Sequence, residues 1–197
     1  LGGDEILVTG DDNTITGNYI GTDATGTLVM GNTGAGIRLD RSANTVIGGT
    51  NVGERNLISG NSGGNVWIDS GSHDIEIQGN IIGPDISGTV ALSNGNGVRI
   101  QDSWNVLVGG GVDGAGNLLS GNAAGVIIEG SAAAYNRVQG NRIGTTADGT
   151  AALGNTTGVD IGYGAHHNFV GTDGDGVRDA SEGNLISGNR EGGLGAA

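Results

Sequence analysis

The sequence contains no cysteine and no lysine, and it is poor in proline and aromatic residues. Its 197 residues include one Pro, two Trp, three Tyr and one Phe. Without Cys there is no disulfide framework, thiolate nucleophile or Cys metal site. The eight basic residues are all Arg and the net charge is −13, so the basic face that nucleic acid binding requires is missing. No apolar run approaches the length of a membrane span.

Glycine is abundant, and its 44 copies fall at repeating positions between short apolar pairs. The phrase N-L-I-S-G-N at residues 56–61 returns 61 residues later as N-L-L-S-G-N at 117–122, and a further 67 residues later at 184–189. A second phrase interleaves with it, at residues 17–21, 79–83 and 140–144. Self-similarity at a nearly fixed period is the signature of a repeat architecture.

Each repeat contains three short segments in which apolar and variable residues alternate, as in Ile37-Arg38-Leu39. This alternation is typical of a strand with one buried face. No hairpin turn joins the segments, so we expect three strands to form one coil and equivalent strands to stack in parallel. The sequence therefore predicts an all-β fold, a single-stranded parallel β-helix (solenoid) of about six coils in one domain, with a two-coil repeat of about 61 residues. The predicted coils are residues 1–32, 33–61, 62–94, 95–122, 123–155 and 156–189, and residues 190–197 would start another.

The strand pattern G-V-x-I, as at residues 97–100, is followed by phrases of the form N-x-I-x-G-N. This combination resembles the right-handed parallel β-helix repeat family, a pectate-lyase-like superfold, over essentially the whole chain. The resemblance implies a right-handed coil, and non-enzymatic secreted or surface repeat proteins are the closest group. It therefore implies an extracellular or cell-surface location in bacteria. The motif is specific for the fold and says little about activity.

Asparagine recurs at two positions of each coil. One set stands two residues before an inward Ile or Leu, and it comprises Asn18, Asn56, Asn80, Asn117, Asn141 and Asn184. A second set closes each coil, and it comprises Asn32, Asn61, Asn94, Asn122, Asn155 and Asn189. Buried amides need hydrogen-bond partners, and stacked copies can supply them to one another. We predict two structural asparagine ladders; binding of a ligand by these amides is the alternative.

The segment 171–182 matches most of the twelve-residue calcium-binding pattern. Its carboxylates occupy positions three, five, nine and twelve, as Asp173, Asp175, Asp179 and Glu182, and Val177 would offer its backbone carbonyl at position seven. Gly171 stands at position one in place of the expected Asp, so one ligand is lost and the affinity should be lower. The sequence leaves two interpretations open, a calcium site formed by these residues and an acidic turn without a bound ion.

The outward residues of successive first strands form a second candidate site. Arg38, Trp67 and Arg99 would stack there, with Asp69 beside them, and an exposed Trp flanked by Arg could contact a glycan. The alternative is a cross-strand stack that only covers the sheet. Asp40 and Asp69 would lie on neighbouring strands and are weak candidates for the carboxylate pair of a glycosidase. The adjacent His166 and His167 are expected to point to opposite sides of a strand, which makes a poor metal site.

Chemistry-bearing residues do not recur at the repeat period, so the sequence favours a non-catalytic structural or binding segment of a secreted or cell-surface protein. Its repetitive face could meet glycans or partner proteins, and its open strand edges could meet neighbouring domains or further copies end to end. The alternative is a polysaccharide lyase or glycoside hydrolase that acts on an acidic polysaccharide along the groove of the first strands.

Overall fold

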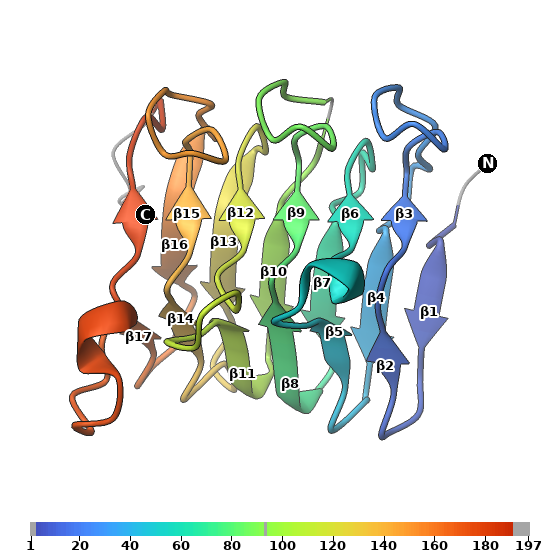
Figure 1. The fold of residues 1–197 in the computed structure, drawn as a ribbon. Coiled ribbons are helices and arrows are strands. Elements are labelled where there is room, and N and C mark those ends of the chain that lie inside the picture. Colours follow the sequence, from blue (N-terminus) through green and yellow to red (C-terminus); the bar gives the residue numbers. More distant parts are fainter. Residues whose placement is uncertain (1–2, 93, 191–197) are drawn as a thin grey trace.

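The structure, a computed structural model, describes residues 3–92 and 94–190. These residues form eighteen short strands and two short 3-10 helices, and the strands make three parallel six-stranded sheets. Every third strand along the chain joins the same sheet, so the backbone winds as a coil whose equivalent strands lie side by side (Figure 1). The predicted parallel β-helix is confirmed. The expected further coil falls almost entirely on residues 191–197, outside the described part.

The first sheet contains β1 (Ile6–Val8), β4 (Ile37–Asp40), β7 (Val66–Asp69), β10 (Val98–Gln101), β13 (Ala124–Glu129) and β16 (Thr157–Gly162). The second contains β2 (Thr14–Ile15), β5 (Val46–Gly48), β8 (His73–Gln78), β11 (Trp104–Gly109), β14 (Arg137–Gln139) and β17 (Phe169–Val170). The third contains β3 (Tyr19–Ile20), β6 (Leu57–Ile58), β9 (Ile81–Ile82), β12 (Leu118–Leu119), β15 (Arg142–Ile143) and β18 (Leu185–Ile186). The helices are η1 (Val52–Glu54) and η2 (Asp179–Ser181).

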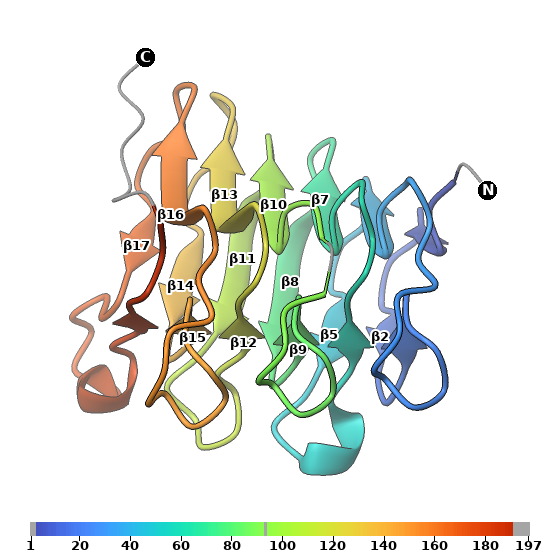
Figure 2. The ribbon, with the colours of Figure 1, turned by 90° about the horizontal axis from the view of Figure 1, so that it is seen from above.

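The chain makes about five turns, slightly fewer than the about six coils predicted. One turn runs from a strand to the equivalent strand of the next coil. The six strands of a sheet, for example β1 to β16, are therefore separated by five turns. The view from above shows the strands of successive coils lying side by side along the stack (Figure 2). No helix within residues 3–92 and 94–190 has the length and hydrophobicity needed to cross a membrane.

The interior is filled by stacked aliphatic side chains. In β4, Ile37 and Leu39 are fully buried while Arg38 between them is partly exposed, as the alternation predicts. The strand register places Ile37 beside Val66, and Val66 beside Val98, so equivalent residues form columns along the stack. Burying such a side chain stabilises the fold by about 1.5–3 kcal/mol. The columns of all three sheets join in one continuous hydrophobic core.

The first predicted asparagine ladder is confirmed over its full length. In each step the Nδ2 of one amide donates to the Oδ1 of the next at 3.0–3.1 Å. The same Oδ1 also accepts the backbone N–H of the preceding Asn at 2.9–3.1 Å. The ladder runs through Asn18, Asn56, Asn80, Asn117, Asn141 and Asn184, and it fixes the corner before the third sheet.

The second predicted ladder is direct only from Asn122 through Asn155 to Asn189, with Nδ2 to Oδ1 distances of 3.1 and 2.9 Å. Earlier in the stack an unpredicted residue, Asn65, joins the column. Its Oδ1 accepts from Asn61 at 3.1 Å, and its Nδ2 donates to Asn122 at 2.9 Å. Asn65 directly precedes β7, and four of the other five strands of the first sheet have Gly at the matching position. Its side chain therefore enters the corner and takes over the contact.

Candidate functional site

The predicted metal-binding side chains come together in the last loop of the described chain. The loop joins β17 to β18 and contains η2, and it projects beside β17 (Figure 1). One carboxylate oxygen from each of four residues lies within 4.8 Å of the others, and the residues are Asp173, Asp175, Asp179 and Glu182. Glu182 is buried and only 6% exposed. This cluster of acidic residues has the geometry to hold a metal ion.

The shape of the loop is set by bonds from its own backbone to these carboxylates. The N–H of Val177 donates to Asp175 Oδ1 at 2.6 Å, and the N–H of Gly176 approaches Asp179 Oδ1 at 3.3 Å. Gly176 has a φ of 82°, which only glycine adopts without strain. The carboxylates therefore converge because the backbone turns sharply between them. Oxygen-rich sites of this kind suit hard divalent cations.

The loop is attached to the two coils before it. Gly140 donates its N–H to the carbonyl of Glu182 at 2.8 Å, and Ser181 Oγ donates to the carbonyl of Gly111 at 2.7 Å. Arg137 on β14 places its Nη1 3.7 Å from Asp173 Oδ2. These contacts hold one side of the acidic cluster against the outer surface of the second sheet.

The predicted glycan-binding column is assembled, but its aromatic ring is covered. The guanidinium carbons of Arg38 and Arg99 lie 4.6 and 4.8 Å from the ring centroid of Trp67. Arg38 donates to Asp69 at 2.9 Å, and Arg99 forms an ion pair with Glu129. These arginines come from the strands on either side of Trp67. A sugar ring could therefore stack on Trp67 only if one guanidinium moved away.

Asp40 and Asp69 lie on neighbouring strands in matching register, as predicted. Each is already engaged by a different arginine, because Arg41 lies 3.2 Å from Asp40 while Arg38 holds Asp69. A retaining or inverting glycosidase needs one carboxyl group that keeps its proton and a second that acts as base or nucleophile. Here both carboxylates have an arginine partner, and these contacts do not distinguish a proton donor from a base or nucleophile.

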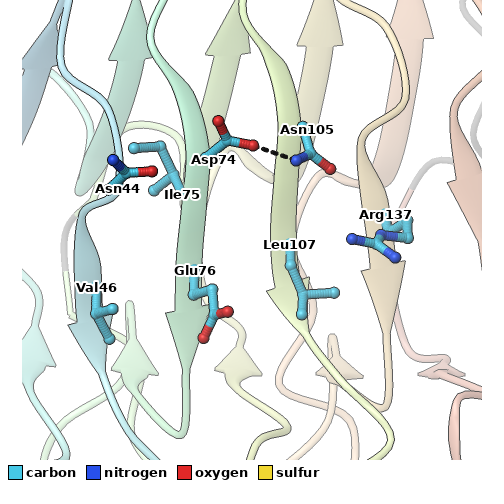
Figure 3. Close-up of a pocket in the computed structure, with 8 residues that line it drawn as sticks. All are labelled: Asn44, Val46, Asp74, Ile75, Glu76, Asn105, Leu107 and Arg137. Atoms are coloured by element: carbon cyan, nitrogen blue, oxygen red, sulfur yellow. Dashed lines mark hydrogen bonds between the residues drawn. The ribbon is translucent and has the colours of Figure 1, made fainter.

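A shallow hollow on the outer face of the second sheet was not predicted. It has a volume of about 430 Å³ and is lined by Asn44, Val46, Asp74, Ile75, Glu76, Asn105, Leu107 and Arg137 (Figure 3). The side chain of Asn105 on β11 donates a hydrogen bond to Asp74 on the neighbouring strand β8. Hydrogen bonds from His73 and Asn105 lower the pKa of Asp74. The residues come from four coils and are brought together by the stacking of the coils.

One signal in the sequence could have indicated this edge of the hollow. In every coil a polar or aromatic residue with φ between 53° and 60° lies either two residues before the strand of the second sheet or at that strand's second position. These residues are Asp12, Asn44, Asp74, Asn105, Tyr135 and His167. Asn and Asp tolerate this left-handed conformation better than most residues. At His167 the same conformation overturns our expectation that His166 and His167 point apart. Their Nδ1 atoms lie 2.7 Å from each other, because His167 leaves the extended conformation that alternation requires.

Comparison of the chain with protein-family models, curated proteins and solved structures found no match. The functional argument therefore depends on the side chains described above. Of the predicted sites, the acidic cluster is the one whose members converge with a single ion pair to an arginine among the described residues, between Arg137 and Asp173. The Trp67 column converges too, but its members are already paired with one another.

Proposed function

We propose that this chain is a non-catalytic structural segment of a secreted or cell-surface bacterial protein, and that its last loop binds calcium. The observation that carries this proposal is the asparagine ladder, whose five steps join six stacked asparagines without a break in the described chain. A rod held in this way at every step is suited to a stiff spacer. The G-V-x-I strands further support membership of the right-handed parallel β-helix repeat proteins.

Calcium fits the acidic cluster better than the other common metal ions. Four carboxylates in close proximity repel one another unless a cation neutralises them. Calcium accepts six to eight oxygen ligands in flexible geometry, whereas zinc is usually held by Cys and His. The ligands would be Asp173, Asp175, Asp179 and Glu182, with the carbonyl of Val177. With no carboxylate at position one, we expect an affinity typical of extracellular modules, with a Kd of about 10⁻⁴ to 10⁻³ M.

Calcium titration followed by thermal unfolding tests this proposal. A ligand present at about 100 times its Kd stabilises the folded state by about 2.7 kcal/mol, so the Tm should rise clearly as calcium is added. Asp175→Asn and Asp179→Asn should abolish most of that rise. Asp113→Asn, in the corresponding loop two coils earlier, is the matched control and should respond as the unmodified chain does. A Tm that does not move at about 10 mM calcium would refute the calcium site.

We further propose that the outer faces of the sheets contact glycans or partner proteins. The support comes from two separate surfaces, the arginines of the Trp67 column on the first sheet and the polar hollow on the second sheet. Binding and turnover should be measured on a panel of acidic polysaccharides, with Asp69→Ala as the control. Binding without turnover is the expected result. Turnover that disappears in the Asp69 variant would instead indicate a polysaccharide lyase or hydrolase.

The ends of the stack support an association with a neighbouring domain or a second copy. Among the described strands, β16, β17 and β18 pair on one edge only, and Val170 and Ile186 there are 42% and 44% exposed. In the ladder each Asn donates from its Nδ2 to the Oδ1 of the next. At one end Asn184 therefore offers its Nδ2, and at the other end Asn18 offers its Oδ1. Two copies stacked head to tail would bring these two groups together and extend the ladder. Sedimentation over a range of protein concentrations should show reversible assembly. A monomer at every concentration would argue against association between copies.

A further inference from the structure

Gln139 lies beside the position at which the acidic loop lacks a ligand. Strands β14 and β17 are in register, with Val138 next to Val170, and the N–H of Gly171 donates to the carbonyl of Val138 at 2.9 Å. The residue of β14 that follows Val138 is Gln139. It therefore neighbours Gly171, the first position of the loop, where the twelve-residue pattern calls for a carboxylate.

The side chain of Gln139 is on the face that carries the acidic loop. Val138 points into the core and is fully buried, so Arg137 and Gln139 on either side of it face outward. Arg137 demonstrates the direction, because it reaches Asp173 at 3.7 Å. Although it faces outward, Gln139 is only 3% exposed. The N–H of the next residue, Gly140, holds Glu182 at the other end of the loop, so the two ends of the loop flank Gln139.

The amide of Gln139 is unsatisfied in this position. Its Nε2 is buried and has no hydrogen-bond partner, which costs free energy in any folded protein. The oxygen and nitrogen of a Gln amide have nearly the same shape, and their assignment follows from the surrounding partners. With the amide rotated by half a turn, the carbonyl oxygen would take the place of the unpartnered nitrogen. A cation in the loop would then give this buried oxygen its partner.

We propose that Gln139 is a ligand of the calcium ion, and that its side-chain carbonyl oxygen replaces the carboxylate missing at Gly171. This inference rests on the calcium function proposed above and adds a residue from the preceding coil to the site. Side-chain amide oxygens are ordinary calcium ligands. The cation thereby bridges two coils, because Gln139 belongs to one and the four carboxylates belong to the next. Calcium binding would then stabilise the stacking of coils as well as the loop.

Calorimetric titration of calcium into the full chain and three variants tests the assignment. Gln139→Met keeps the length of the side chain and removes the oxygen, so its affinity should fall about 10-fold or more. Gln139→Glu restores a carboxylate beside position one and should bind calcium more tightly than the unmodified chain. Gln78→Met is the matched control, because Gln78 occupies the same place one repeat earlier, beside a loop without the acidic cluster. It should leave the affinity unchanged.

Unfolding in a calcium chelator separates ligation from a purely structural role. Because the buried end of the Gln139 amide has no partner without the ion, Gln139→Met should be at least as stable as the unmodified chain under these conditions. Equal calcium affinity in the unmodified chain and in Gln139→Met would overturn the role of Gln139 and leave the calcium site standing. Weaker binding that Gln139→Glu fails to restore, together with lower stability in chelator, would also overturn it. No calcium binding by the unmodified chain at about 10 mM would overturn both proposals.

Discussion

Asn80 and Asn117 are joined by two hydrogen bonds that converge on one atom. The Oδ1 of Asn117 accepts the backbone N–H of Asn80 at 2.9 Å and its side-chain Nδ2 at 3.1 Å. Both residues are 1% exposed. Each amide in the column thus satisfies the residue before it and depends on the one after it, so the removal of one member should be felt in two coils.

Asn117→Ala should destabilise the fold by about 2–4 kcal/mol, because the buried N–H of Asn80 loses its acceptor and the Nδ2 of Asn80 loses one of its three acceptors. The control is Asn18→Ala at the first position of the ladder, where the backbone N–H of residue 18 still reaches Asn56 Oδ1. We expect that variant to cost less than about 1 kcal/mol. Urea unfolding of both variants measures the difference. Equal and small losses would show that the ladder contributes little to stability.

Arg99→Met should destabilise the protein by about 1–2 kcal/mol, because it removes a cation from one face of Trp67 and leaves Glu129 unpaired. Arg41→Met also breaks an ion pair, with Asp40, but the Arg41 side chain is 76% exposed. That control should therefore change stability by less than about 0.5 kcal/mol. Trp fluorescence during unfolding in low and high salt provides the measurement. If the two variants behave alike, the covering of Trp67 is not a stabilising contact.

Gly109→Ala should be more damaging than Gly171→Ala, although the two glycines occupy equivalent positions in different coils. Both have positive φ, at 91° and 96°, which costs an L residue about 1–2 kcal/mol. A Cβ at Gly109 would in addition overlap the carbonyl oxygen of Gln139, whereas a Cβ at Gly171 meets no atom within 4 Å. We expect a loss above about 4 kcal/mol at Gly109. Urea unfolding of both variants in a calcium chelator measures their losses of stability. Similar losses would contradict the close approach of Gly109 to Gln139.

Asp23 should titrate at unusually low pH. Hydrogen bonds from the Thr25 hydroxyl and from the N–H of Leu28 lower its pKa to about 2. Since the pKa in the folded state is below the unfolded value of 3.8, the carboxylate favours folding at neutral pH, and this contribution disappears as the pH falls from about 4 to about 2. Thr25→Val should raise the pKa of Asp23 and leave that of Asp148, in the equivalent loop, unchanged. The chemical shifts of the carboxyl carbons follow both titrations. An unchanged pKa of Asp23 in Thr25→Val would contradict the hydrogen bond from Thr25.

The period of the chain made the coil predictable, and the Asn positions made the first ladder predictable, because a repeated residue in a stacked fold must lie beside its own copies. The second ladder was predicted less well. Asn65 replaces a Gly at the start of one strand, and nothing local in the sequence shows that its amide enters a corner. The acidic loop could be recognised because its carboxylates follow one another within twelve residues. Gln139 could not be, because it is separated from that loop by a full turn of the coil.

The sequence by itself determined which residues repeat, and therefore the winding of the backbone, its buried columns and its chief asparagine column. Period and alternation are local properties that each coil imposes in the same way. The tertiary structure decided which outward side chains meet, because those contacts form between coils and depend on side-chain reach. It closed Trp67 between two arginines, turned His167 toward His166, and placed an unpaired amide beneath the acidic loop.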